Sequence, residues 1–428
     1  MPSRIFLAAM TTLLAAATPV RGEESKPVRL RVATYNVSMY RDGPFQLASE
    51  LFQEGSAQAT RIAEVLQRVR PDIVLLNEFD RDYEKDWARR GFMGRRYLQR
   101  PQAGLEPIVY PHFYYAPVNT GVSSGIDLDR DGQVRGPNDA FGFGRYPGQY
   151  GMLLLSRFPI DHEASHAFSK LRWIDTSDAK LPIDSETGEH YYSEEALNVF
   201  RLPSKSFWDV CVRVPGSGGQ PLHLLCSHPA PPVFDGPEDR NGKRNFDEIG
   251  LVAKYLSGLP DLFVDDEGKR VTPPTDEPCV VLGDLNADPV DGDGVAGAIQ
   301  QLLEHPRIDS SFTPTSRGGA AASLATPEVN GAHRGDPAAD TANFGGEGYA
   351  NLRVDYVLPT RGIRVIDGGV YWPVAGEPGA EAIGATDHRL VWLDLELPAT
   401  PCDAANKPGL PRRSPTSPPP ALAPPAPR

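Results

Sequence analysis

Apolar and polar positions in the first third of the chain follow the order of a strand, a helix and a second strand. Residues Arg29–Val37 alternate and are rich in β-branched side chains, which is typical of a strand. In residues 56–69 the apolar positions recur at helical spacing, which predicts a helix with Ser56 as its N-cap and Pro71 as its stop. Residues Asp72–Leu76 form a short apolar run that predicts a buried strand. This β-α-β order indicates a layered α/β domain.

The same patterns predict further elements up to residue 397, so that residues 28–397 form one domain. Two stretches that are rich in Gly, 79–150 and 306–349, have little periodicity and are predicted to be long loops. The predicted helices are 245–256 and a short one at 295–303. The predicted strands are 151–155, a hairpin of 207–214 and 222–227, then 279–282, 352–358, 363–371 and 389–397.

Both ends of the chain differ from this domain. Residues 1–22 are typical of a secretory signal peptide, because Arg4 precedes an apolar run that is too short to span a bilayer and small residues follow it. A buried N-terminal helix is the alternative for this segment. Residues 398–428 are rich in Pro and predict a disordered or polyproline-like tail. We therefore expect a secreted or periplasmic protein, and no other apolar run is long enough to predict a transmembrane helix.

Composition and charge narrow the classes of protein. The 43 Pro and 41 Gly among 428 residues stay below the share of about 25–30% that is typical of disordered chains. The chain can therefore build a core, and fibrous, collagenous and coiled-coil proteins are excluded. The net charge is −13, so no strongly basic surface holds nucleic acid by counterion release alone. We expect a monomer in which any phosphate ligand is held locally, by metal ions.

The cysteines permit a disulfide in an exported protein. There are four, Cys211, Cys226, Cys279 and Cys402, and none of them has zinc-finger spacing. Cys211 and Cys226 lie on the two predicted hairpin strands, nearly opposite one another, so we favour a bridge between them. The alternative is that both are small buried apolar residues.

Polar side chains stand where the predicted strands end. In layered α/β folds ligands bind at strand ends, where loops converge. Carboxylate and amide oxygens gathered there make a site that suits Mg²⁺, Mn²⁺ or Ca²⁺. The side chains in question are Asn36, Glu78, His228, Asp284, Asn286, Asp355, Asp387 and His388.

This set of groups fits phosphodiester cleavage. A hard cation offsets the charge on the phosphoryl oxygens and on the leaving oxygen. A carboxylate, or a His paired with one, takes a proton from the attacking water, and a second His protonates the leaving alkoxide. Asp284 and Asn286 lie on the same side of their chain, because β side chains repeat every two residues. The adjacent Asp387 and His388 point in different directions, so one can touch metal while the other touches phosphate.

In sequence these elements resemble the endonuclease/exonuclease/phosphatase (DNase I-like) superfamily, whose members include DNase I, AP endonucleases, sphingomyelinases and inositol-polyphosphate 5-phosphatases. The similar pieces occur in the family's order over residues 29–397. They are ATYNV at Asn36, RIAEVLQRVRPDIVLLNE ending at Glu78, GMLLLSRFPI, LLCSHPAPP at His228, VVLGDLNADP at Asp284, RVDYVL at Asp355 and ATDHRLV at His388.

The resemblance implies an α/β (α+β) fold, a four-layer α/β/β/α sandwich of two mixed sheets. It also implies Glu78 as the principal ligand of Mg²⁺ or Mn²⁺, with Asn36 and Asp387 near the ion. By the same resemblance Asp284 and Asn286 align the water and the phosphate. His388, paired with Asp355, then acts as base or phosphate clamp. The remaining His228 is the second acid/base.

The sequence motifs indicate the type of reaction more specifically than they indicate the substrate. Ala287-Asp288-Pro289 follows the GDLN segment where the 5-phosphatases usually have an aromatic residue and Arg, which disfavours an inositide. The His-x-x-Pro-Pro segment at His228 resembles DNase-like nucleases, so we expect a nuclease, with Arg145, Arg240 and Arg244 as candidate phosphate contacts. The alternatives are a phospholipid (sphingomyelinase-like) or small phosphate-ester hydrolase and a non-catalytic exported binding protein.

A separate acidic segment matches the first half of an EF-hand-type loop. Asp127, Asp129 and Asp131 stand at the first, third and fifth positions, and Gly132 follows at the sixth. The twelfth position is Asn138 rather than Glu, and no helical pattern flanks the segment. We therefore consider a structural Ca²⁺ site here, with a solvated acidic loop as the alternative.

Overall fold

The computed structural model describes residues 27–52, 56–259, 262–345 and 348–398. The predicted signal peptide and nearly all of the Pro-rich tail lie outside these ranges. Within the described ranges, the helices are all too short or too polar to cross a membrane.

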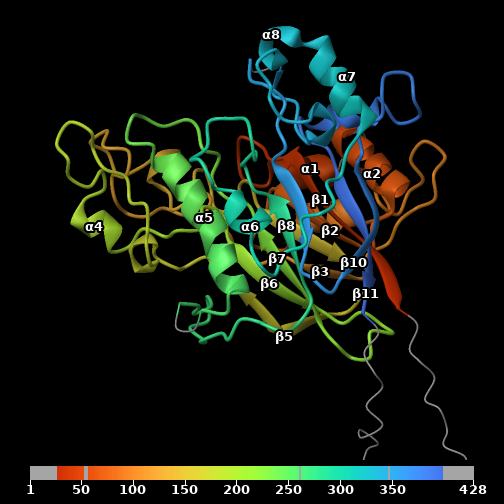
Figure 1. Ribbon diagram of the computed structural model, residues 1–428, viewed down its shortest axis with the longest axis horizontal. Coiled ribbons are helices and arrows are strands. Elements are labelled where there is room, and N and C mark those ends of the chain that lie inside the picture. Colours follow the sequence, from red (N-terminus) through yellow and green to blue (C-terminus); the bar gives the residue numbers. More distant parts are fainter. Residues whose placement is uncertain (1–26, 53–55, 260–261, 346–347, 399–428) are drawn as a thin grey trace, which may run out of the picture.

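Two mixed β-sheets form the centre of the molecule (Figure 1). In each sheet one pair of strands is parallel, β1 with β2 and β7 with β8, and the other pairs are antiparallel. The first sheet has the order β10-β11-β1-β2-β4-β3, with β10 Arg364–Val370, β11 Val391–Leu397, β1 Val28–Met39, β2 Ile73–Phe79, β4 Met152–Ser156 and β3 His112–Tyr114. The second has the order β5-β6-β7-β8-β9, with β5 Ile160–Ala167, β6 Phe207–Val212, β7 Leu222–Ser227, β8 Cys279–Asp284 and β9 Asp355–Pro359.

The inner faces of the two sheets pack on each other. Val32 and Leu75 of the first sheet share one apolar cluster with Val210 and Leu224 of the second. These side chains are fully buried, so the cluster removes a large apolar area from water and fixes the distance between the sheets.

One long helix covers the outer face of each sheet. The helix α2 (Ala57–Val69) packs Ile62 and Leu66 on the first sheet, and Ser56 caps it by accepting a hydrogen bond from the Ala59 N–H. The helix α5 (Arg240–Leu256) packs Ile249 and Val252 on the second sheet. In Figure 1 α5 and α2 lie on opposite sides of the strands. The four-layer DNase I-like sandwich is thereby confirmed.

The two stretches predicted as loops contain additional short elements. The stretch 79–150 holds α3 (Trp87–Met93) and β3, while α7 (Arg317–Ala325) and α8 (Pro327–Asn330) lie in the stretch 306–349. A loop was the wrong prediction for α7, whose weakly amphipathic Gly- and Ala-rich sequence is capped by the Ser316 hydroxyl. The remaining helices are α1 Gln46–Phe52, α4 Glu194–Leu197 and α6 Gln300–Leu303.

The predicted disulfide between Cys211 and Cys226 is wrong. The register of the hairpin places Cys211 opposite His223 and Cys226 opposite Trp208, so the two cysteines are not partners across the strands. Both are free and buried, as is Cys279, and Cys402 lies outside the described residues. The alternative holds, in which these cysteines are small buried apolar residues.

Candidate active site

The strand ends that carry the predicted groups meet at one pocket of about 900 Å³. Asn36 and Asp355 are buried behind the pocket wall, where they contact Asp284 and His388. Asn36 and Glu78 come from neighbouring parallel strands, and Asp284 and Asp355 pair across two antiparallel strands. The predicted side chains that line the pocket are Glu78, His228, Asp284, Asn286, Asp387 and His388.

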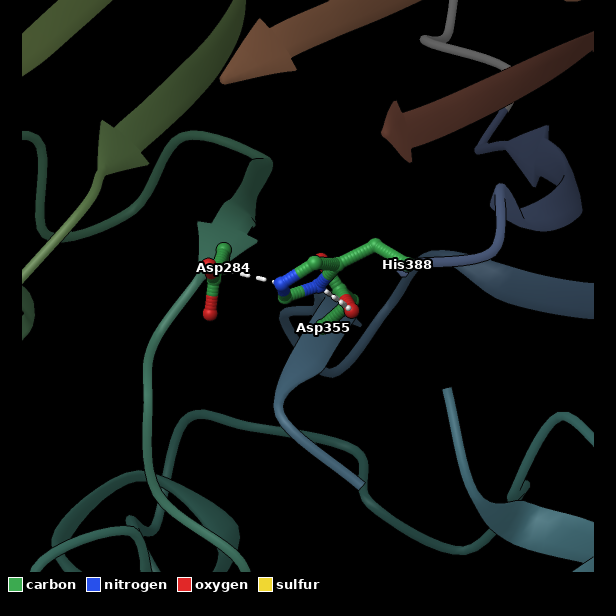
Figure 2. Close-up of side chains that lie close together, drawn as sticks. All are labelled: Asp284, Asp355 and His388. Carbon is green, nitrogen blue, oxygen red and sulfur yellow. Dashed lines mark hydrogen bonds and ion pairs between the residues drawn. The ribbon is translucent and has the colours of Figure 1, made fainter. Parts of the chain in front are cut away.

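Asp284 takes part in a network of hydrogen bonds and ion pairs, in which His388 lies between Asp284 and Asp355 (Figure 2). His388 Nδ1 lies 2.8 Å from Asp355 Oδ2, and its other ring nitrogen, Nε2, lies 3.7 Å from Asp284 Oδ2. His228 Nε2 approaches the same Asp284 oxygen at 3.4 Å, and Asn36 Nδ2 donates to it at 3.0 Å. Two imidazoles therefore share one carboxylate, an arrangement that can pass a proton between a water molecule and a bound ester.

The charges in this network follow from burial and from the neighbouring groups. Burial alone lowers the pKa of His388, but the negative charges of Asp355 and Asp284 outweigh it and raise that pKa well above its usual value. Burial raises the pKa of Asp284, yet the charge of His388 and the hydrogen bond from His228 hold it below the usual range. Burial and the nearby Lys205 charge lower the pKa of His228 to about 4. At neutral pH His388 is charged, Asp284 is ionised and His228 is neutral.

Glu78 stands apart from this network. It ends β2 with a left-handed backbone (φ 56°), and no hydrogen bond from the described part of the chain reaches its carboxylate. Burial raises the pKa of Glu78 to about 7, although the charges of His388 and Lys205 act in the other direction. A half-buried carboxylate without hydrogen-bond partners is a group that a cation stabilises.

The oxygens around Glu78 fit a divalent metal ion. Asp387 lines the same pocket, with its Oδ1 atom 3.1 Å from the hydroxyls of Ser38 and Thr386, which donate to it. Asn36 Oδ1 accepts from the Ser38 N–H at 3.1 Å, which leaves a second lone pair. Carboxylate and amide oxygens are the ligands of hard cations such as Mg²⁺ and Mn²⁺. Glu78, Asp387 and Asn36 are the residues that would hold this ion, and this ligand set stays a prediction.

Two clusters of ionisable groups have the spacing of a metal site among the described residues. One is Asp284, Asp355 and His388, in which the bond between Asp355 and His388 already occupies Nδ1. The other contains Asp127 and Asp129 together with the buried Asp139. Asp131, which the sequence placed in a Ca²⁺ site, is not part of this cluster, and its carboxylate accepts from the Gln133 N–H at 2.7 Å.

Sequence reasoning missed residues that line or support the pocket. Lys205 lines it, directly before β6, and α5 anchors its segment: Glu248 accepts from the backbone N–H groups of Ser204 and Ala230. Asn245, one turn earlier, donates to the carbonyls of Ala230 and Leu285 at 2.8 and 3.0 Å. Lys205 could have been found, because β6 is antiparallel to β7 and therefore starts where β7 ends, next to His228.

The three arginines predicted to contact phosphate are engaged elsewhere. Arg145 pairs with Asp42, and Arg240 pairs with Glu238. Arg244 is buried and donates to backbone carbonyls, including that of Leu202 at 2.9 Å. Among the cations that line the pocket, Arg240 has a carboxylate partner, and Arg244 donates to several backbone carbonyls. Lys205 has one carbonyl acceptor and no carboxylate partner in the described ranges.

The similarity of this chain to known proteins identifies the family to which it belongs. None of the curated proteins matches it. A solved endonuclease/exonuclease/phosphatase from Beutenbergia cavernae DSM 12333 shares 18% identity over 86% of this chain and 72% of its own, with a TM-score of 0.43. A family protein from Bacteroides thetaiotaomicron shares 14% (87% and 99% covered, TM-score 0.44), and sphingomyelinase C from Streptomyces griseocarneus shares 12% (87% and 100% covered, TM-score 0.39). The family model described as Endonuclease/Exonuclease/phosphatase family matches residues 33–388, so the chain belongs to that family.

Proposed function

We propose that the protein is an exported phosphodiester hydrolase that depends on a divalent metal ion. The observation that carries this proposal is the shared pocket, in which a carboxylate without hydrogen-bond partners, Glu78, lies beside the network of Asp284 and two imidazoles. Membership of a family that is generally hydrolytic and metal-dependent supports it. A Mg²⁺ or Mn²⁺ ion bound by Glu78, Asp387 and Asn36 would stabilise negative charge on the phosphate.

The side chains on the other half of the pocket supply the proton transfers. Asp284, with the neutral His228 beside it, accepts the proton of a water molecule whose oxygen forms the new bond to phosphorus. As the bond from phosphorus to the leaving oxygen breaks, His388 donates its proton to that oxygen. Asp355 holds the His388 ring in position through Nδ1, so that Nε2 faces the substrate. Transfer of the first proton from Asp284 to His388 restores the starting state.

For the substrate we propose nucleic acid, and single strands rather than duplex. Duplex DNA is usually bound by a track of basic side chains, and the three candidate arginines of this chain, Arg145, Arg240 and Arg244, are engaged with other groups. Aromatic rings instead stand exposed at the pocket, and stacking of an unpaired base on such a ring contributes about 1–3 kcal/mol. These side chains come from four loops and are Tyr40 (39% exposed), Phe143 (55%), Phe234 (72%) and Tyr349 (45%).

A phospholipid headgroup ester is the second candidate, because the same aromatic side chains can insert at a membrane surface. Incubation of the purified protein with a set of substrates distinguishes a nuclease from a phospholipid hydrolase. The substrates are single-stranded DNA, duplex DNA, RNA, sphingomyelin vesicles and bis(p-nitrophenyl) phosphate. Cleavage of single strands that stops with EDTA and returns with Mg²⁺ supports the nuclease. Release of phosphocholine moves the assignment to the lipid. Absence of metal-dependent turnover on every substrate contradicts the hydrolase and favours an exported binding protein.

The proposal that the protein is exported rests on the sequence of residues 1–22 alone. The expected result is that the mature protein recovered outside the cytoplasm begins after Ala17 or Gly22, as read by N-terminal sequencing. Recovery of a chain that still begins at Met1, inside the cell, contradicts it.

A further inference from the structure

Lys205 is a buried cation without a carboxylate partner. Its side chain lines the active-site pocket, and only 7% of the residue is exposed. The ammonium group donates to the Pro229 carbonyl at 3.3 Å, and no ion pair joins it to a carboxylate in the described part of the chain. A lysine ammonium has three N–H donors, so two of them have no partner within the described protein.

Keeping a cation in this place costs free energy. Burial lowers the pKa of Lys205, while the charges of Glu248, Glu78 and Asp284 raise it and offset part of the cost. None of these carboxylates lies close enough to form an ion pair with it. An apolar side chain of similar length would fill the same space without this cost, so packing alone does not explain a lysine here.

A second donor lies next to the ammonium group. Asn286 Nδ2 donates to the same Pro229 carbonyl oxygen, at 3.1 Å. The Asn286 backbone is left-handed (φ 50°), and its N–H donates to Asp284 Oδ1 at 3.0 Å, which fixes the residue beside the catalytic carboxylate. The Lys205 ammonium and the Asn286 amide therefore share one anchoring oxygen, and both line the pocket.

The protein holds this arrangement with a buried carboxylate from α5. Glu248 is 4% exposed and accepts from Ser204, which precedes Lys205, and from Ala230, which follows the anchoring Pro229. One side chain thus ties together the segment that presents the cation and the segment that presents the shared carbonyl. Such fixed donors need little reorganisation when an anion binds.

We propose that Lys205 is a further phosphate-binding residue, which contacts the phosphoryl oxygens beside Asn286, the residue that the family resemblance already assigns to the phosphate; the two side chains form a phosphate-binding pair. The inference rests on the proposed function for its catalytic meaning, since it names a further residue that touches the substrate. An oxyanion bound here meets the ammonium group and the amide as hydrogen-bond donors, and it gives the buried cation its missing counter-charge.

Binding of inorganic phosphate, measured by calorimetry with Mg²⁺ and again with EDTA, tests the pair without any need for turnover. Lys205→Met should weaken phosphate binding by roughly tenfold or more in both conditions. Lys205→Arg, which keeps the charge, should restore part of the affinity. Lys254→Met is the matched control, because Lys254 lies near the end of α5 and donates to the Ser177 carbonyl outside the pocket; its phosphate binding should equal that of the wild type.

Thermal unfolding separates this role from a structural one. Removal of an unpaired buried charge should raise the Tm of Lys205→Met, whereas loss of a structural ion pair would lower it. Lys205→Gln serves as a second variant if the methionine variant does not fold. Equal phosphate affinity of wild type and a folded Lys205 variant, or a wild type that binds no phosphate, overturns the inference.

Kinetics distinguish this inference from the proposed function. If the wild type hydrolyses none of the tested phosphodiesters but binds phosphate through Lys205, the proposed function fails and the anion site stands. If the wild type is active and Lys205→Met has the same KM and kcat, the phosphate-binding pair fails and the proposed function stands.

Discussion

Two buried Asp–His pairs in this protein have nearly the same geometry and very different surroundings. His388 Nδ1 lies 2.8 Å from Asp355 Oδ2, and His223 Nδ1 lies 2.7 Å from Asp209 Oδ1. All four side chains are buried, and in both pairs the carboxylates raise the pKa of the imidazole against the opposite effect of burial.

The pairs differ in what the second ring nitrogen meets. His388 Nε2 faces the pocket, with Asp284 Oδ2 at 3.7 Å. His223 Nε2 is bonded to Glu277 at 2.8 Å, and Asp209 accepts a further bond from the Tyr255 hydroxyl at 2.6 Å. A pair whose groups are all satisfied by the protein stabilises the fold, whereas a pair with one nitrogen left for a ligand can transfer a proton. The nitrogen that faces the pocket, rather than the Asp–His bond itself, is therefore the feature that the proposed catalysis requires.

The largest effect is expected from removal of the His388 imidazole. Glutamine does not exchange a proton near neutral pH, so His388→Gln should lower kcat/KM by about 10²–10⁴-fold. His223→Gln is the matched control and should leave kcat/KM unchanged. Equal losses in both variants, measured on one phosphodiester substrate, would erase the contrast between the pairs.

Substitution of Asp355 or Asp209 by asparagine tests the same difference between the two Asp–His pairs. Asp355→Asn should reduce kcat by about 10–100-fold, because the amide no longer favours the charged, correctly oriented His388 ring. Asp209→Asn should leave kcat intact and lower the Tm, since it weakens the bonds to His223 and Tyr255. Steady-state kinetics and thermal unfolding of both variants test whether Asp355→Asn loses mainly kcat and Asp209→Asn loses mainly Tm. A fall of kcat in Asp209→Asn contradicts this expectation.

The free carboxylate beside the catalytic pair has its own test. Glu78→Gln should weaken Mg²⁺ binding by at least about tenfold, because a neutral amide replaces a carboxylate that no hydrogen bond compensates. Glu277→Gln, which changes the carboxylate of the closed pair, should bind Mg²⁺ like the wild type. Calorimetric titration of both proteins gives the two affinities, and unchanged binding in Glu78→Gln would remove this residue from the metal site.

The smallest effect is a pH-dependent change in stability at the closed pair. Burial lowers the pKa of His223, but the hydrogen bond and charge of Asp209, with Glu277, raise it above the unfolded value in net. Its charged form therefore stabilises the fold fully below about pH 6.5, and this stability is lost as the pH rises through the folded pKa. His223→Gln should cost about 1–3 kcal/mol at pH 5.5 and less at pH 9, as measured by urea unfolding. A loss of unfolding free energy in His223→Gln that increases with pH would contradict this prediction.

The sequence predicted the convergence of the candidate groups because they stand at strand ends, and strand ends converge in a layered fold. The structure places Glu78, His228, Asp284 and His388 in the lining of one pocket. Asn36 and Asp355 lie behind that lining, where they bond to Asp284 and His388. The β-α-β order at the N-terminus predicted a layered α/β domain, and the resemblance of segments over residues 29–397 to a known family implied the four layers.

Features that depend on strand register, or on contacts between residues far apart in the sequence, could not be predicted from the sequence. The position of Cys211 relative to Cys226 depends on which residues end the hairpin strands, and a shift of three residues separated them. Glu248 and Lys205 are joined only by the fold, since their segments lie about 40 residues apart in sequence. Asp139 replaced Asp131 in the acidic cluster because the chain turns back at residues 137–139.

Hydrolysis of bis(p-nitrophenyl) phosphate in ¹⁸O-labelled water with Mg²⁺ tests the central claim most directly. If water at Asp284 attacks phosphorus, mass spectrometry should find one ¹⁸O atom in the p-nitrophenyl phosphate product and none in the p-nitrophenol. Label in the p-nitrophenol, or product formation that continues unchanged with EDTA, would contradict the account.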